Sequence, residues 1–191
     1  GAPQPLVDVT DPAIPRLFSV YPDPVDRAGR SIANPDDGKP TAYGLALYRD
    51  RSAGRYFALV TQAGEAVVAK WEVVGKGEKV CARFVKEWRF PYVYKGQDLT
   101  QVVKGEAAKS FSPQFEGLAV DQQTGIAYAG QEDVGIWRIH LTDGRDEAEP
   151  RPFVETRAFD PATPIARDVE GLTIYYGRGR SGYLIASSQG A

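Results

Sequence analysis

Two acidic residues occupy the same position in a short pattern that the chain repeats. Glu116 precedes Gly-Leu in residues 115–120, and Glu170 precedes Gly-Leu in residues 169–174. Tyr43 holds the matching position in a third copy. Carboxylates are ligands for hard metal ions, and a phenol can donate a hydrogen bond to a phosphate oxygen. The spacing therefore indicates a site built from equivalent positions of repeated units.

Each copy of the pattern is an apolar run followed by a polar turn with glycine and a second apolar run. This strand–turn–strand unit is typical of repeat architectures. The glycines at 44, 117 and 171 are 73 and 54 residues apart, somewhat more than the roughly 40–50 residues of one four-stranded propeller blade. Insertions such as residues 94–112 would account for the excess. We expect an all-β fold, a partial β-propeller with about four blades' worth of chain.

The whole chain, residues 1–191, is expected to be one incomplete propeller domain. Residues 1–40 are rich in Pro and Asp and are expected to be irregular, apart from a strand at 16–21, whereas 41–191 carries the repeated hairpins. One helical turn is expected around residues 98–103. The other predicted strands are 43–48, 55–61, 66–74, 80–90, 115–120, 126–130, 134–139, 169–176 and 182–188.

Antiparallel pairing places the acidic positions on one rim of the sheets. It brings the start of the first strand of a hairpin beside the end of the second. Glu116 should therefore approach Glu132, which follows the second strand of its hairpin. By the same argument Asp168 and Glu170 should approach Gln189. In a propeller these rims would converge around the central channel.

Carboxylates gathered in this way would repel one another unless a cation neutralised them. Calcium accepts six to eight oxygen ligands in flexible geometry and is the natural counterion. The alternative is that these residues are unrelated acids of turns and surface, and spacing alone leaves both interpretations open. The recurrence at matching positions favours the metal.

Composition excludes several other kinds of site. A net charge of −2 does not favour binding to nucleic acid or to an anionic membrane. With one cysteine and one histidine there is no zinc cluster. Cys81 is expected to be a buried structural residue, and His140 should end a strand. The candidate anion contacts, expected to be mostly solvated, are Lys70, Lys76, Lys79, Arg178 and Arg180.

Five segments, in preserved order, resemble the β-propeller phytases. The resemblance runs from about residue 41 to the end and is densest over 113–139 and 166–190. The segments that carry it are Ala-Tyr-Gly-Leu at 42–45, Phe-Glu-Gly-Leu-Ala-Val-Asp at 115–121, Gln-Glu-Asp-Val-Gly-Ile-Trp at 131–137, Asp-Val-Glu-Gly-Leu-Thr-Ile-Tyr-Tyr at 168–176 and Gly-Tyr-Leu-Ile-Ala-Ser-Ser-Gln-Gly at 182–190.

The resemblance implies a six-bladed propeller that uses Ca²⁺ to hydrolyse phytate, myo-inositol hexakisphosphate, bound as its calcium complex. Water would attack phosphorus directly, with no covalent enzyme intermediate. Glu116, Glu132 and Glu170 would be catalytic, and Tyr43 would bind phosphate. The same resemblance implies a secreted or periplasmic protein, although residues 1–3 are not expected to belong to a signal peptide. The implied metal ligands are Glu116, Glu132, Asp168, Glu170 and Gln189.

The chain departs from the family pattern in two places. A family lysine expected near residues 62–64 is missing, and residues 1–40 do not match the early blades with their basic residues. The later blades would lie beyond Ala191. Two alternatives therefore remain: a non-catalytic module that binds calcium and a phosphorylated small molecule, and a calcium-dependent lactonase-type propeller. Open propeller edges also predict complementation or oligomerisation.

Overall fold

The computed structural model describes residues 5–8, 16–19, 42–76, 79–102, 104, 110–142, 150–179 and 181–190, and every regular element among them is a β-strand. None of these segments forms a helix long and apolar enough to cross a lipid bilayer. The strands are β1 (Pro5–Asp8), β2 (Arg16–Ser19), β3 (Ala42–Asp50), β4 (Arg55–Gln62), β5 (Val67–Lys76), β6 (Lys79–Arg89), β7 (Val93–Tyr94), β8 (Gln97–Asp98), β9 (Phe115–Asp121), β10 (Ile126–Gln131), β11 (Gly135–His140), β12 (Arg151–Glu155), β13 (Val169–Tyr176) and β14 (Gly182–Ser188).

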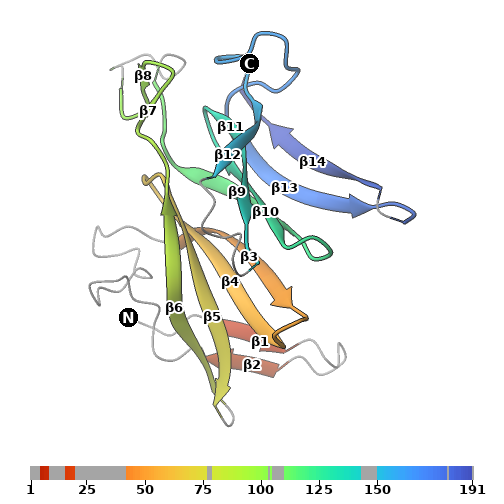
Figure 1. Ribbon diagram of the computed structural model, residues 1–191. Helices are drawn as coiled ribbons and strands as arrows, with labels where there is room; N and C mark the ends of the chain where they lie inside the picture. Colours follow the sequence, from red (N-terminus) through yellow and green to blue (C-terminus); the bar gives the residue numbers. More distant parts are fainter. Residues whose placement is uncertain are drawn as a thin grey trace.

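Consecutive strands pair in antiparallel fashion and form separate sheets (Figure 1). Strands β3 to β6 form one four-stranded sheet, β9 to β12 form a second, and β13–β14 form a hairpin. The short pairs β1–β2 and β7–β8 complete the described strands. The chain therefore has the expected all-β architecture of a partial propeller. The described part contains two four-stranded sheets and one hairpin of the repeat, fewer than the four blades expected.

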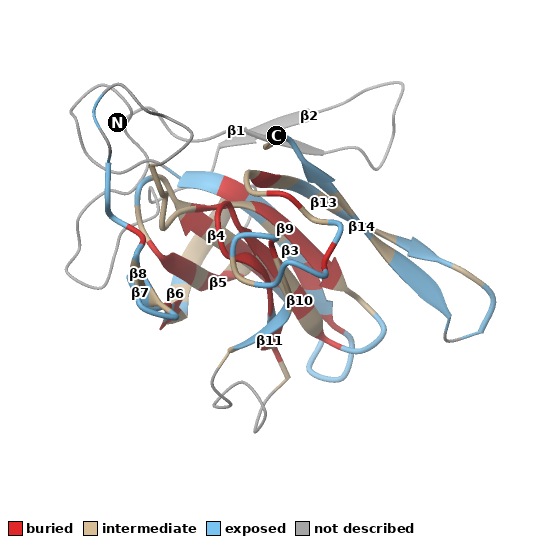
Figure 2. Ribbon diagram, turned by 90° about the horizontal axis from the view of Figure 1, so that it is seen from above, coloured by how far each residue is buried: buried red, intermediate tan, exposed pale blue. Residues whose placement is uncertain are grey.

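The main core lies between the two four-stranded sheets. In β4 the side chains alternate, so that Phe57, Leu59 and Thr61 are buried and their neighbours are more exposed. Phe57 and Leu59 belong to one apolar cluster with Trp88 of β6 and Trp137 of β11. Figure 2 shows buried strands concentrated in these two sheets, whereas β13 and β14 are largely exposed. Burial of one face per sheet explains the period-two pattern of the sequence.

Lys70 of β5 links the two sheets and is not a solvated charge, which corrects the expectation for this residue. It is 2% exposed. Its Nζ donates a hydrogen bond to the Leu141 carbonyl at 2.9 Å and lies 4.3 Å from the centroid of the Phe57 ring. Arg178 is exposed, as expected, and the side chains of Lys76, Lys79 and Arg180 lie outside the described residues.

The repeat glycines let the first strands of successive sheets pack closely. A Cβ atom on Gly44 of β3 would overlap the carbonyl oxygen of Glu116, at the start of β9. A Cβ atom on Gly117 would in turn overlap the carbonyl oxygen of Glu170, at the start of β13. Only glycine allows so close a backbone approach. The three copies of the pattern are therefore in direct contact, β3 with β9 and β9 with β13.

Most strand predictions are confirmed, but β12 and the short strands β7 and β8 were not predicted, and one predicted helical turn is absent from the described residues. Strand β12 was not predicted, because Pro152 interrupts its sequence. It is the edge strand of its sheet, where proline is tolerated. The predicted helical turn at 98–103 is wrong for the described part. Asp98 and Gln101 form a hydrogen-bonded turn instead, and the Asp98 carboxylate accepts a hydrogen bond from the Thr100 amide.

Two further expectations concern Cys81 and the N-terminal segment. Cys81 is only partly buried, because β6 is the edge strand of its sheet, so the expectation of a buried residue is wrong. His140 ends β11 as expected. The strand expected at 16–21 is present as β2, and it pairs with the unpredicted β1. The remainder of residues 1–41 lies outside the described part.

The close approach at Gly117 generates a first prediction. Gly117→Ala should force β9 away from β13, because the new methyl group would occupy the space of the Glu170 carbonyl oxygen. We expect a loss of about 1–3 kcal/mol in the free energy of unfolding, measured by urea denaturation. The matched control is Gly75→Ala in β5, where a Cβ atom would meet nothing within 4 Å. Equal losses in both variants would contradict the steric role of Gly117.

The ion pairs of Glu72 generate a second prediction. Its carboxylate accepts a hydrogen bond from Arg55 at 2.7 Å and also contacts Arg83. These contacts, chiefly the one with Arg55, outweigh the effect of burial and lower the pKa of Glu72 from 4.5 to about 2. A depressed pKa stabilises the fold above the unfolded-state value of 4.5, and this contribution is lost as the pH falls toward 2.

We therefore expect Glu72→Gln to lower the free energy of unfolding by about 1–3 kcal/mol at pH 7. The loss should be at the lower end of this range, because Arg83 is exposed to solvent. The difference between variant and wild type should shrink as the pH falls below 4.5. Urea denaturation at several pH values measures it. A difference that is constant with pH would show that the ionic contacts of Glu72 do not stabilise the fold.

Candidate functional site

The same irregularity interrupts all three hairpins of the repeat. In β3, β9 and β13 two residues face a single residue of the partner strand, which is the geometry of a β-bulge. The two consecutive residues of the bulge are Tyr43 and Gly44 in β3, Glu116 and Gly117 in β9, and Glu170 and Gly171 in β13. They occupy the same position of the sequence pattern in each copy. Bulges change the direction of a side chain and are common beside active sites. Each bulge therefore places its Tyr43, Glu116 or Glu170 side chain at an equivalent position.

Thr61 fixes the first of these bulges to the next sheet. Its hydroxyl accepts a hydrogen bond from the Gly44 amide at 2.7 Å and donates one to the Phe115 carbonyl at 2.8 Å. Tyr43 then reaches across the same boundary, and its hydroxyl donates a hydrogen bond to Oε2 of Glu116 at 3.1 Å. The structure thus brings these two predicted site residues into direct contact.

The surroundings of Tyr43 show how near the other carboxylates lie. Partial burial raises the pKa of Tyr43, and the hydrogen bond to Glu116 raises it further. The negative charges of Glu116, Glu132 and Glu170 add to the same effect. The charges of three of the predicted site carboxylates therefore act on one phenol.

Glu132 lies in the turn between β10 and β11 and is only 9% exposed. Its carboxylate accepts a hydrogen bond from the side-chain amide of Gln114, and its own amide donates to the Gln114 carbonyl at 3.1 Å. Its carbonyl accepts a hydrogen bond from the Val169 amide at 3.0 Å, which ties this turn to the start of β13. Burial raises the pKa of Glu132, and the charges of Asp168 and Asp133 contribute.

Asp168, Glu170 and Gln189 form a second group. The Asp168 backbone is left-handed, with φ of 64°, and its carbonyl accepts a hydrogen bond from the Gln189 amide at 3.0 Å. The Gln189 side chain donates to the Glu170 carboxylate. Partial burial and the charges of Glu116 and Asp168 raise the pKa of Glu170. The predicted approach of Asp168 and Glu170 to Gln189 is present in the structure.

Glu116, Glu132, Asp168 and Glu170 will be called the acidic rim. Among the described residues, no three His, Cys, Asp or Glu side chains are grouped closely enough to hold a metal ion. The donors of the rim are nonetheless hard carboxylate oxygens with an amide oxygen beside them, the chemistry that Ca²⁺ prefers. Burial raises the pKa of both Glu170 and Glu132, and repulsion by neighbouring carboxylates adds to the effect. A bound divalent cation would relieve this repulsion, so the residues fit calcium by chemistry.

Several residues that contact the rim or flank it in the chain were not predicted as site residues. Gln114 contacts Glu132, and Asp133 contacts Arg167, whose Nε lies 2.6 Å from Oδ1 of Asp133. Gln131 is fully buried and its side chain accepts a hydrogen bond from the Trp137 indole at 2.9 Å. Gln131 and Asp133 flank Glu132 in the chain, and Arg167 precedes Asp168. This adjacency is the one signal in the sequence that could have identified these three residues as part of the site.

Comparison with known proteins agrees with this geometry. A family model described as phytase matches residues 26–191. A 3-phytase of Bacillus subtilis (strain 168) is 33% identical over 170 residues. That match covers 84% of this chain and 36% of the relative, so the chain corresponds to about a third of the relative's length. The family match, the repeated bulges and the acidic rim agree: the chain belongs to the phytase family.

Proposed function

We propose that the chain forms part of a calcium-dependent phytase that hydrolyses phosphomonoesters of myo-inositol hexakisphosphate. The observation that carries the proposal is the alignment of Tyr43, Glu116 and Glu170 on three adjacent strands, each at an equivalent bulge. The family match supports the substrate class. We extend the proposal to the secreted or periplasmic location that is implied by the family resemblance.

The proposed metal ligands are the acidic rim and Gln189. Calcium bound there would screen the charge of substrate phosphates and lower the pKa of a bound water molecule. The phenol of Tyr43 donates a hydrogen bond to the Glu116 carboxylate, and Glu170 holds the equivalent bulge position on the adjacent strand, so these three side chains would face the same phosphate. If Glu116 held the cation, the Tyr43 hydroxyl would be free to donate its hydrogen bond to a phosphate oxygen instead.

In the proposed reaction a water molecule attacks phosphorus directly. A new P–O bond forms as the water molecule gives up a proton, the ester P–O bond breaks, and the inositol oxygen takes up a proton to leave as a hydroxyl group. Glu116, Glu132 and Glu170 are the proposed catalytic carboxylates. Because a bound cation would relieve the repulsion that contributes to the raised pKa of Glu132 and Glu170, these carboxylates would act by holding the cation and orienting the attacking water molecule.

The proposal predicts a metal-dependent release of phosphate. The 191-residue chain, incubated with calcium and phytate, should release phosphate that EDTA abolishes and added calcium restores. Glu170→Gln should lower kcat at least about tenfold, because the amide that replaces the carboxylate carries no negative charge to bind the cation. The control is Glu87→Gln, which removes an ion pair with Arg89 in β6. Phosphate release that is indifferent to EDTA would contradict the proposal.

One observation favours the non-catalytic alternative. The turn after β4, at residues 62–65, borders the rim, since the Gly64 amide donates a hydrogen bond to the Gln114 side chain at 2.8 Å. It carries no lysine or arginine to bind phosphate. Calcium-dependent binding of phytate in calorimetry, without phosphate release, would identify a binding module. The lactonase-type alternative has less support, because the matching family is phytase.

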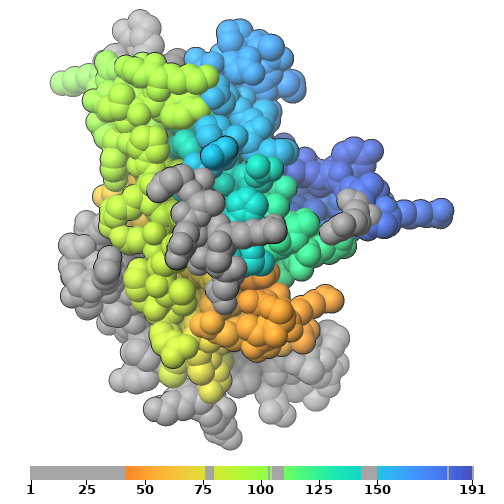
Figure 3. Space-filling view, viewed as in Figure 1, coloured from red at the N-terminus to blue at the C-terminus, as the bar shows by residue number. Residues whose placement is uncertain are grey.

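We also propose that the outer faces of the first and last sheets pack against further propeller blades. Figure 3 shows the β13–β14 hairpin extending from the body of the molecule. Tyr175, Tyr183 and Ile185 on its outer face are 59%, 72% and 51% exposed, and Leu45 and Leu47 of β3 are 63% and 61% exposed. Large apolar faces of this kind are typical of contact surfaces.

Packing of this kind predicts concentration-dependent association of the 191-residue chain in sedimentation velocity. Tyr183→Lys should weaken the association, because it places a charge on an apolar contact face. The control is Arg178→Lys, which keeps the charge of an exposed residue at the end of the same hairpin. Sedimentation as a monomer at every concentration would contradict the proposal for this chain.

A further inference from the structure

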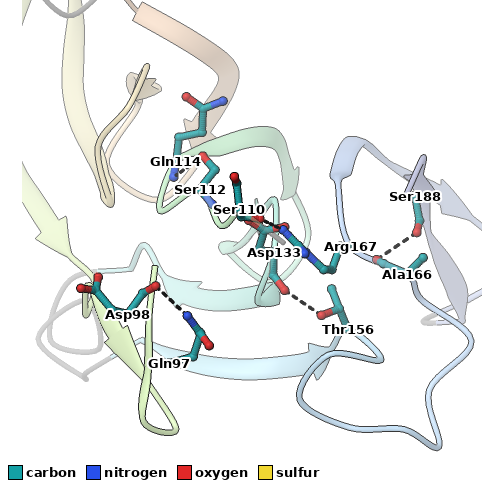
Figure 4. A network of polar contacts seen from close by, with 10 residues as sticks. All are labelled: Gln97, Asp98, Ser110, Ser112, Gln114, Asp133, Thr156, Ala166, Arg167 and Ser188. Carbon is teal, nitrogen blue, oxygen red and sulfur yellow. Dashed lines mark hydrogen bonds and ion pairs between the residues drawn. The ribbon is translucent and has the colours of Figure 1, made fainter. Parts of the chain in front are cut away.

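Arg167 immediately precedes Asp168 of the acidic rim, and its side chain reaches the neighbouring sheet (Figure 4). Its Nε donates a hydrogen bond to Oδ1 of Asp133 at 2.6 Å, and a terminal nitrogen donates to the Ser110 carbonyl. The guanidinium carbon also lies 4.2 Å from the centroid of the Phe111 ring. One side chain therefore contacts both the turn after β10 and the segment before β9.

Asp133 connects Arg167 with the residues that hold Glu132. The second carboxylate oxygen of Asp133 accepts a hydrogen bond from the Ser112 amide, and its carbonyl accepts one from the Thr156 hydroxyl at 2.7 Å. Two residues after Ser112, Gln114 holds Glu132 through both its side chain and its carbonyl. The ion pair of Asp133 with Arg167 thus fixes the turn that carries Glu132 against the segment that binds the Glu132 carboxylate.

The main chain around Arg167 fixes the other half of the rim. The Arg167 carbonyl accepts a hydrogen bond from the Gly190 amide at 3.0 Å, and the Asp168 carbonyl accepts one from the Gln189 amide. The Ala166 carbonyl accepts one from the Ser188 hydroxyl at 3.0 Å. The left-handed conformation of Asp168 is uncommon for a residue other than glycine. Such a conformation persists only where the surrounding contacts hold it.

Burial makes the ion pair consequential. The side chain of Asp133 is 7% exposed and that of Arg167 is 25% exposed. Removal of the arginine would leave a buried carboxylate without its cation, which is far more costly than loss of a surface pair. Lysine could restore the charge, but it lacks the planar fork with which arginine reaches two acceptors. The site therefore demands an arginine for geometry as well as for charge.

We propose that Arg167 is a positioning residue that holds the Glu132 turn and the Asp168–Gln189 segment in register. Through Asp133 its side chain sets where the Glu132 carboxylate lies, and by anchoring residues 166–168 to the Asp133 turn it also sets where Asp168 and Gln189 lie. The structural part of this proposal stands on the contacts alone. Its consequence for metal binding rests on the proposed function, in which these residues bind calcium.

The experiment uses Arg167→Gln and Arg167→Lys in the 191-residue chain. Hydrogen exchange without calcium should show that Arg167→Gln accelerates exchange of the Ser112, Glu132, Gln189 and Gly190 amides at least about tenfold. Calorimetry should show calcium binding weakened about 10- to 100-fold, the range for residues that orient metal ligands. Arg167→Lys should lie between the wild type and Arg167→Gln in both measurements.

The matched control is Arg55→Gln, which breaks a similar pair with the buried carboxylate of Glu72 in another part of the fold. It should lower Tm without a selective effect on the rim amides or on calcium affinity. Two results for Arg167→Gln would overturn the proposal. One is wild-type exchange at the amides of Ser112, Glu132, Gln189 and Gly190. The other is faster exchange that is spread evenly over the chain, as in Arg55→Gln.

Two further outcomes are also decisive. If Arg167→Gln does not fold, Arg167→Lys decides: the proposal stands if its rim amides exchange selectively faster, and it falls if they do not. If the wild type itself binds no calcium, the proposed function fails. The exchange measurement still supports or overturns the positioning role, because it is made without metal.

Discussion

The arrangement of this molecule depends on a close backbone contact that only glycine permits. Gly44 lies against the carbonyl oxygen of Glu116, and Gly117 lies against that of Glu170. Each contact joins the first strand of one sheet to the first strand of the next. Because the residue before each glycine is part of the same bulge, the contact that joins the sheets also sets the positions of Tyr43, Glu116 and Glu170.

The electrostatics of the rim follow from this geometry. The close packing of β9 against β13 also brings their carboxylates toward one another, and these negative charges repel. The raised pKa of Glu170 is partly a consequence of the neighbouring charges of Glu116 and Asp168. Binding sites often retain strain and repulsion of this kind, because the ligand relieves them. The hydrogen bonds from Gln114 and Gln189 hold the carboxylates of Glu132 and Glu170 in place.

The sequence predicted what depends on local pairing. Hairpins, their glycine turns and the approach of Glu170 to Gln189 follow from the period-two pattern and short connections. Contacts between sheets were harder to predict from the sequence. The alternation of apolar and polar residues indicates which side chains are buried, but not which side chains of another sheet they contact. Lys70 illustrates this: it looks like a surface charge in the sequence, yet it donates a hydrogen bond to the carbonyl of Leu141, which directly follows β11 of the next sheet. Strand β12 was missed because Pro152 is acceptable only at an edge, and edge position is a property of the whole sheet.

The hydrogen bond between Trp137 and Gln131 has an optical consequence. The Trp137 indole is 4% exposed and donates to the side chain of Gln131, which is adjacent in sequence to Glu132. Indole fluorescence responds to the polarity and the electric field of its surroundings. A charge placed near Glu132 would change the electric field at the Trp137 indole, because the buried side chain of Gln131 lies between them in the chain of contacts. The protein therefore carries a native indole that is hydrogen-bonded next to its acidic rim, and the fluorescence of this indole would respond to a change of charge at Glu132.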